Sequence, residues 1–323
     1  MSAAEEHLAT RRAAGLFDFS FMSLAEIAGA DAEPFLERLQ TRLVAPLEPG
    51  QIAYTLLLRE DASVFVDATL WRHAHGRWWL FTGRRSDVAW IGGLASGFDV
   101  DVRDRSGEFA ILALQGPRCF DLIEGRPRYF RFADARVEGH AACIARLGFS
   151  GELGLEILVP ADQGAELSAK LERSGARRCS FEATDSLRIE SGYILFSNEL
   201  AEKPDPFELG LGRLVTGHGF VGAEALRKKR FAGPRRRLVG LVPAGRRTER
   251  RDLPEAQLTS ECWSPIFGRQ LGMGFARTEE AAPGTLVRLA DGRLARCARL
   301  PFYDPARLLP RRRLHCEDHH KRD

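Results

Sequence analysis

The sequence predicts an α+β body followed by a small all-β domain, and three observations carry this prediction. Helical patterns alternate with pairs of strands, whereas a doubly wound sheet would need regular strand-helix-strand units. No Gly-x-Gly-x-x-Gly follows a predicted strand, which leaves a dinucleotide-binding fold unsupported. Beyond a basic run at 227–237, short strands recur at even spacing between Gly and Pro turns, which is typical of a small all-β domain.

Apolar spacing, caps and turns predict the order of elements in the body. Asp31 is the cap of one helix and Pro34 lies in its first turn, while the Pro49-Gly50 turn ends that unit. Helices are predicted near the amino terminus and over 31–39, 86–96, 119–123, 161–174 and 185–194. Strands are predicted over 16–20, 52–58, 63–71, 78–82, 99–103, 109–115, 142–147 and 155–159, and the run 126–136 is predicted to be a solvated face.

A change in composition predicts the domain boundary. Basic residues cluster at 227–230 and again at 233–237, beside Gly and Pro, which is typical of an exposed linker. A chain of 323 residues is long enough for two domains with their own cores. We therefore expect a body over residues 1–230, a β-domain over 238–309 and a charged tail over 310–323. Strands of the second domain are predicted over 238–242, 271–277, 286–289 and 294–300.

The composition excludes several classes of protein. With 44% hydrophobic and 28% charged residues and a formal net charge of +3, the chain is globular and has no general electrostatic attraction for nucleic acid. The amino terminus lacks the apolar core of a signal peptide, and no run approaches the length of a membrane span. The six cysteines form no Cys-x-x-Cys pair, so no metal site is expected. We expect a soluble cytoplasmic protein with reduced thiols.

Two carboxylates stand in apolar surroundings and are candidates for function. Asp67 lies in the predicted strand VFVDATLW, where an acid is a poor fit on both propensity and desolvation. The alternative is an aspartate on a strand face that is open to water. Glu190 lies among Leu187, Ile189 and Ile194 at the end of a predicted helix, before a polar loop. The alternative for Glu190 is an ordinary ion pair with Arg188 or another arginine.

Several short motifs in a fixed order carry a resemblance to a known family. The motifs are spread over nearly the whole chain. Each motif is weak alone, but their common order is specific for one family. In chain order the motifs are LQT at 39–41, PGQ at 49–51, LQGP at 114–117, GFSGELGLEI at 148–157, LRIESG at 187–192, FSNE at 196–199, PFELGLG at 206–212, LTS at 258–260, GMG at 272–274 and PFYDP at 301–305. The chain resembles the aminomethyltransferase (T-protein) family of the glycine cleavage system.

The resemblance implies a fold, a cofactor and the roles of the two acids. It implies a ring-like folate-binding body, capped by a small C-terminal β-barrel, with tetrahydrofolate in the central opening. The acid of the family's strand motif, which lies beside the reacting nitrogens of the pterin, falls on Asp67. The acid of its Arg-hydrophobic-Glu motif, which is taken to bind the pterin ring, falls on Glu190. A carboxylate suits both tasks, because it accepts hydrogen bonds from pterin N–H groups and stabilises developing positive charge.

The resemblance also implies further residues that bind the folate. Phe149 and Phe196 stand where the family has tyrosines, and Val66-Asp67 stands where it usually has two adjacent acids. A family arginine aligns with Gly219, so His218 or Arg213 is expected to substitute for it. The residues expected to contact the folate besides Glu190 are Tyr54, Phe149, Glu152, Phe196, Asn198, His218 and Tyr303.

Three functions are consistent with these motifs. The first is a tetrahydrofolate-dependent transferase that takes a methyl or aminomethyl carbon from a small donor. The second is a non-catalytic folate-binding accessory protein, and the third is a subunit of an amine dehydrogenase or demethylase system. The expected partners are the small methyl or aminomethyl donor and, for the third function, a dehydrogenase or carrier protein. Asp67 discriminates between them, because a scaffold has no reason to keep an acid in an apolar strand.

Overall fold

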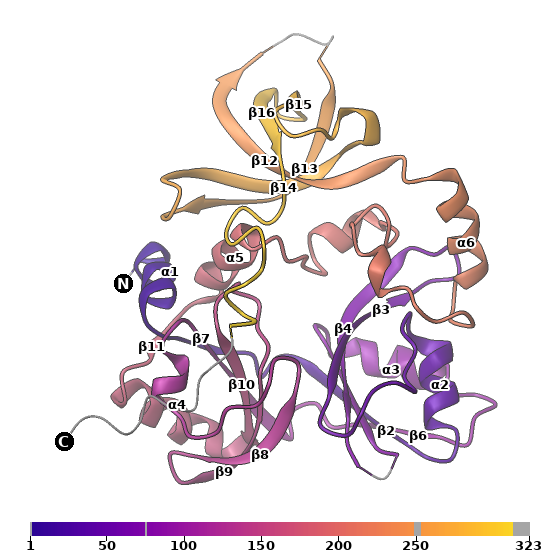
Figure 1. Ribbon diagram of the computed structural model, residues 1–323, viewed down its shortest axis with the longest axis vertical. Helices are drawn as coiled ribbons and strands as arrows, with labels where there is room; N and C mark the ends of the chain where they lie inside the picture. The colour runs from indigo at the N-terminus through magenta and orange to yellow at the C-terminus, as the bar shows by residue number, and fades with distance from the viewer. Residues whose placement is uncertain (1, 75, 249–252, 313–323) are drawn as a thin grey trace.

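The computed structural model describes residues 2–74, 76–248 and 253–312, and it shows two sheets and a barrel arranged as a ring (Figure 1). The two sheets form the lower part of the view and the barrel lies above them. Helix α5 lies beneath the barrel on one side, and helix α6 descends from the barrel on the other. The architecture therefore agrees with the predicted α+β body and C-terminal barrel.

The first sheet has the strand order β3-β4-β5-β2-β6, all antiparallel neighbours. Helices α2 and α3 pack on one face, where Phe35, Leu36 and Ile91 join Val66 and Leu70 in a single core. The opposite face of this sheet has neither of these two helices packed on it. The elements are β2 Ser23–Ala28, α2 Ala32–Leu39, β3 Ile52–Leu58, β4 Val64–Arg72, β5 Trp78–Thr82, α3 Ser86–Gly93 and β6 Asp101–Asp104.

The second sheet has the order β11-β1-β7-β10-β9-β8. Helix α4 covers one face through Leu167 and Leu171, and an aromatic core that includes Phe17 and Trp71 joins the opposite face to the first sheet. The elements are α1 Ala3–Arg12, β1 Gly15–Asp18, β7 Phe109–Gln115, the 3₁₀ turn η1 Cys119–Asp121, β8 Phe132–Val137, β9 His140–Ala145, β10 Gly154–Pro160, η2 Ala161–Gln163, α4 Gly164–Arg173, β11 Arg177–Arg178 and α5 Phe181–Glu190.

The segment after α5 connects the body to the barrel and packs on the first sheet. Leu200, Leu209 and Leu214 lie in one core with Leu56 and Val64. This places a long loop, with little regular structure, against strands β3 and β4. Its elements are η3 Glu199–Glu202, η4 Gly212–Leu214 and α6 Ala223–Ala232.

The carboxyl-terminal strands close into a barrel in the order β12-β14-β13-β15-β16. Strand β16 pairs with β12, which leaves no free edge between them. Strands β13 and β14 approach closely at Gly274, where an added Cβ would lie 2.1 Å from the carbonyl oxygen of Gln257. The elements are β12 Arg236–Arg247, β13 Glu255–Ser264, β14 Arg269–Arg277, η5 Thr278–Glu280, β15 Leu286–Leu289 and β16 Arg293–Ala298.

The structure differs from the predicted elements in several places. Strands β2, β8, β11 and β13 and helix α6 were not predicted, and β8 lies in the run expected to be only a solvated face. Helix α6 and the start of β12 occupy most of the run 227–237, which was expected to be an exposed linker. Residues 301–309, expected in the barrel domain, return to the body instead: the amide of Tyr303 donates to the Glu190 carbonyl at 2.9 Å. Of the expected charged tail, residues 313–323 lie outside the described part of the chain.

The described helices are all too short or too polar to cross a membrane.

Candidate functional site

Asp67 lies on β4 with its side chain on the face of the first sheet that is turned away from α2 and α3. Its neighbours Val66 and Ala68 point the other way, into the core beneath those helices. Asp67 is opposite Leu56 in the register with β3, and its side chain is partly accessible. Strand β4 borders the centre of the ring in Figure 1. The strand period therefore turns this acid toward the centre of the molecule.

A tyrosine supplies the hydrogen bond that Asp67 accepts. Tyr54 is opposite Thr69 on the neighbouring strand, which makes it a diagonal neighbour of Asp67 on the same face. Its hydroxyl donates to Asp67 Oδ2 at 2.9 Å. Burial raises the pKa of Asp67, the Tyr54 bond opposes this, and the charges of Asp87 and Glu199 add to the rise. Burial and the neighbouring Asp67 also raise the pKa of Tyr54 well above its usual value.

An arginine and an aromatic ring lie next to the end of β5, the strand that pairs with β4. Arg84 follows β5 and is held by Asp87, with 2.9 Å between its Nη2 and Oδ1. Its guanidinium lies 4.9 Å from the centroid of Phe65 and 5.7 Å from that of Phe196. Phe196 packs so closely on Gly83 that an added Cβ would lie 2.5 Å from the ring. The surroundings of Asp67 therefore combine a partly accessible acid with the Arg84–Asp87 ion pair and the Phe196 ring.

Glu190 lies at the end of α5, and its carboxylate is fully buried. Arg11 donates to Oε2 at 2.7 Å, His7 Nε2 lies 3.1 Å from the same oxygen, and the Ser264 hydroxyl donates to Oε1. Burial alone would raise the pKa of Glu190, but the contacts with His7, Arg11 and Ser264 outweigh it and lower the pKa. The structure is thus at odds with the prediction that Glu190 binds pterin donors, because protein groups already engage both oxygens.

Glu152 and Tyr303 belong to the same cluster as Glu190. Arg11 Nη1 lies 3.2 Å from Glu152 Oε1, and the Arg11 guanidinium stacks 3.8 Å from the centroid of Tyr303. Burial and the hydrogen bond to Glu152 raise the pKa of Tyr303 to about 12. These contacts tie α1, the loop before β10 and the returning C-terminal segment together. The two residues were expected to contact the folate, whereas here their described contacts are within the protein.

Phe149 and His218 lie apart from both groups. Phe149 packs 5.1 Å from the centroid of Phe17 and 4.9 Å from that of Phe19, in the aromatic core between the sheets. This packing differs from the expected contact with a folate. His218 is exposed on the loop between η4 and α6.

Asn198 fixes the connecting loop to the barrel. Its amide nitrogen donates to the Ser260 hydroxyl at 3.1 Å and to the Thr259 carbonyl at 3.2 Å. The neighbouring Glu199 is fully buried and pairs with Arg188 at 2.8 Å. The expected folate contact of Asn198 is thus replaced, in the described contacts, by a bond across two domains.

The comparisons with known proteins agree with this architecture. The family model described as the GCVT N-terminal domain matches residues 1–218. The chain belongs to the aminomethyltransferase (glycine cleavage T-protein) family. An aminomethyltransferase from Rubrobacter xylanophilus is 34% identical, with 92% of this chain and 85% of the relative covered, and one from Geobacillus kaustophilus is 34% identical over 94% and 91%. The crystal structure of the glycine cleavage system aminomethyltransferase T from Bartonella henselae has a TM-score of 0.83 at 29% identity, with 93% of this chain and 89% of that chain covered.

Several residues around the two acids of this T-protein family member were not predicted from its sequence. Arg84 and Asp87 flank the Asp67 site, and their i, i+3 spacing at a helix start was the available signal. Arg11 and His7 had no such signal, because Arg11 is 179 positions from its partner Glu190. The long sequence separation of both residues from Glu190 therefore gave no local signal for the contacts that lower the Glu190 pKa.

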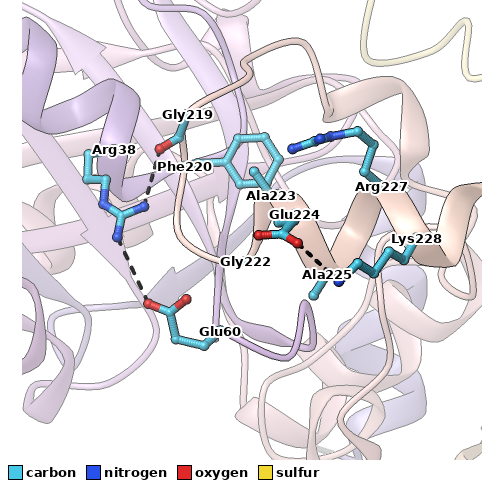
Figure 2. A pocket seen from close by; sticks show the side chains of 10 residues that line it. All are labelled: Arg38, Glu60, Gly219, Phe220, Gly222, Ala223, Glu224, Ala225, Arg227 and Lys228. Carbon is cyan, nitrogen blue, oxygen red and sulfur yellow. Dashed lines mark hydrogen bonds and ion pairs between the residues drawn. The ribbon is translucent and has the colours of Figure 1, made fainter.

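A separate hollow of about 480 Å³ lies at the start of α6 (Figure 2). Arg38 and Glu60 face each other across it at 4.0 Å, and Glu224 pairs with Lys228 at 3.0 Å. All four side chains are exposed. None of the predicted site residues lines this hollow, so the candidate site of this T-protein family member remains the surroundings of Asp67.

Proposed function

We propose that the protein is a tetrahydrofolate-dependent transferase that moves a one-carbon unit, methyl or aminomethyl, from a small donor to a folate nitrogen. The observation that carries this proposal is the acid on the inner face of β4: Asp67 is partly accessible, and among the described side chains its hydrogen-bond donor is the neutral Tyr54. The names of the relatives, aminomethyltransferases, support the same reaction class.

The surroundings of Asp67 fit a reduced pterin. Tyr54 donates to Oδ2, and none of the described side chains donates to Oδ1, so a ligand N–H group can donate to the carboxylate. Phe196 offers an apolar ring next to Gly83, the residue that follows β5. When bound, tetrahydrofolate supplies the nitrogens that accept the carbon. Asp67 then accepts a hydrogen bond from an N–H group of the pterin, or stabilises the positive charge that develops during the transfer.

Asp67 accelerates transfer through charge. A carboxylate interacts weakly with a neutral reduced folate and strongly with the cationic species that forms while carbon and nitrogen bond. Burial strengthens that interaction, since the local dielectric is low. Tyr54 orients the carboxylate while leaving it anionic, because the pKa of the tyrosine is raised. Asp67 is therefore the proposed catalytic residue, and Tyr54 its positioning residue.

The Glu190 cluster has a different proposed role. It holds α1, α5 and the β13 end of the barrel in one arrangement, through Arg11, His7 and Ser264. We assign Glu190 to the support of the ring, and the contact with the pterin to the β3-β4 face. The donor is proposed to be a small methylated or aminomethyl compound, free or presented by a partner dehydrogenase or carrier protein.

The test is to measure tetrahydrofolate affinity and carbon transfer for the wild type and Asp67→Asn. The variant keeps the shape and removes the charge, so it should bind tetrahydrofolate within a few-fold of wild type and lose about a hundredfold to a thousandfold in turnover. Unchanged transfer would remove Asp67 from the mechanism. Folate binding by a wild type that transfers no carbon from any donor would favour the accessory function.

A further inference from the structure

Positive charge is concentrated on helix α6 and the turn that follows it. Residues 224–237 contain seven arginines or lysines and one acid, Glu224, so this stretch carries a formal charge of +6, whereas the whole chain carries +3. The remaining residues are therefore net acidic. A local field of this kind attracts acidic molecules even where the net charge of the protein is small.

The body holds one face of α6 and leaves the other open. Leu226 is buried in the core between the connecting loop and the first sheet, and Lys229 is turned toward Asp205 at 3.7 Å. Residues three and four positions apart share a face of a helix, so the opposite side points to solvent on the outside of the ring (Figure 1). This outer face of α6 consists of the exposed Arg227, Lys228, Arg230 and Phe231.

Two cations of the outer face have no acidic partner in the described part of the chain. Lys228 pairs with Glu224 at 3.0 Å, but no ion pair is described for Arg227 or Arg230. The helix dipole favours cations in the last turn, which includes Arg230 and excludes Arg227. Like charges three positions apart also destabilise a helix. An acid from another molecule would relieve this repulsion.

Phe231 adds an apolar group to these charges. Its side chain is 89% exposed, more than any other large apolar side chain that the structure describes. It follows Arg227 by four positions and therefore lies beside it on the helix surface. Aromatic and arginine side chains are the groups that contribute most to protein–protein interfaces. The outer face therefore has the composition of a protein-binding surface.

The hollow at the start of α6 adjoins this face, because Arg227 and Lys228 also line the hollow (Figure 2). Two acids, Glu60 and Glu224, lie in the same lining. They would repel the continuous phosphates of nucleic acid or of an anionic membrane, whereas a peptide carries its acids at separate positions. Membrane-binding helices also need an apolar face, and Leu226 of α6 is buried against the body.

We propose that the outer face of α6 and this hollow bind an acidic segment of a partner protein, with carboxylates on Arg227 and Arg230 and an apolar side chain on Phe231. Guanidinium groups bind carboxylates through paired hydrogen bonds. The ten residues of α6 span about 15 Å, the length of about five extended residues. A contact of this size is weak and transient, and its affinity falls with rising salt.

The first experiment measures binding of a short amidated peptide of Glu and Asp with one central Leu, by fluorescence polarisation. Reversing both charges in Arg227→Glu/Arg230→Glu should weaken binding at least about 10-fold, and Phe231→Ser about 3- to 10-fold. A peptide with Ser in place of Leu should lose the effect of Phe231→Ser. Arg173→Glu, in the last turn of α4, is the control and should bind as the wild type does. Unchanged Tm values show that the variants are folded.

The second experiment locates the peptide by lysine acetylation and mass spectrometry. Lys228 and Lys170 each pair with a glutamate four positions earlier on a helix, at 3.0 Å and 2.9 Å, so Lys170 is a matched control. The peptide should slow acetylation of Lys228 in proportion to the bound fraction and leave Lys170 unchanged. Asp67→Asn should give the same result as the wild type, because this surface does not depend on the proposed folate reaction.

Three results would overturn the proposal: no peptide binding by the wild type, equal binding by the charge-reversed variant, or no protection of Lys228. Oligouridylate and vesicles of equal parts phosphatidylserine and phosphatidylcholine are measured alongside the peptide. Tighter binding of either, lost on charge reversal, would assign the face to nucleic acid or to a membrane instead. Self-association in sedimentation that charge reversal abolishes, without peptide binding, would assign it to a second copy of the chain.

Discussion

Glu190 and Asp67 are both carboxylates in the interior of this protein, and their surroundings shift their pKa values in opposite directions. The Glu190 carboxylate contacts Arg11, His7 and Ser264, and these contacts lower its pKa. Among the described side chains Asp67 accepts from Tyr54, which carries no charge, and the pKa of Asp67 is raised. Burial acts on both groups, so the difference comes from the cations nearby. A carboxylate with its own cation stabilises the fold, whereas one without a cation is available to a ligand.

The largest effect on stability is expected from removing the Glu190 carboxylate. Glu190→Ala leaves Arg11 and His7 buried without their acid, so the free energy of unfolding should fall by about 3 to 5 kcal/mol. A lowered folded-state pKa stabilises above the unfolded pKa, and this contribution is lost as the pH falls through the folded value. Urea unfolding of both proteins should therefore differ at pH 7 and converge in acid. Exposed Glu124→Ala is the control; a difference as small as its own would contradict the structural role.

A third carboxylate, Glu156, extends the comparison to a group whose pKa is shifted by burial, with no ion pair to any residue that the structure describes. It lies on β10 opposite Ala113 and Ala145, and is 6% exposed. Burial raises the pKa of Glu156 from 4.5 to about 7. A raised carboxyl pKa destabilises the fold increasingly as the pH rises from the unfolded value to the folded one, and fully above it.

Glu156→Gln should therefore stabilise the protein at pH 8 by up to about 3 kcal/mol, because one pKa unit corresponds to 1.36 kcal/mol. The gain should shrink between pH 7 and pH 4.5 and vanish below that, where the glutamate is protonated in both states. Denaturant unfolding at pH 4, 6 and 8 measures it. A gain that is independent of pH would show that packing of the amide, rather than charge, causes the change.

The comparison also shows what the sequence could predict. The strands over 52–58, 78–82 and 109–115 were predicted with the observed bounds, because each is a run of apolar and aromatic residues between clear turns. Strands β2 and β13, SLAEIA and EAQLTSECWS, carry Glu and Ala that disfavour strands. Their partners in the sheets, rather than their composition, make them strands.

For the site, the sequence pattern identified two acids among apolar residues. It did not indicate which of the two acids forms an ion pair. The alternative of an arginine partner was correct for Glu190, yet the partner is Arg11 instead of Arg188. Arg188 pairs with Glu199 and Asp185. Such pairings depend on packing between elements distant in the chain, which spacing along one helix does not contain.

The smallest expected effect is on the stability of Asp67→Asn, and its sign is the sharpest test of the comparison. Asp67 is destabilising where it is charged, since burial raises its pKa, so the asparagine variant should have a higher free energy of unfolding at pH 7. The gain should be smaller than for Glu156→Gln, because the Tyr54 hydroxyl and partial access to water offset part of the cost.

The pH dependence separates charge from packing in Asp67→Asn. The gain should be full above the folded-state pKa of Asp67 and should decrease as the pH falls toward the unfolded value of 3.8, where the acid takes up a proton and resembles the amide. Tyr54→Phe is the matched variant: it removes the described side-chain donor to Asp67 and should lower stability at pH 7 more than at pH 4. A loss of stability in Asp67→Asn at pH 7 would mean that the acid has a partner that stabilises its charge, and the distinction between Asp67 and Glu190 would fail.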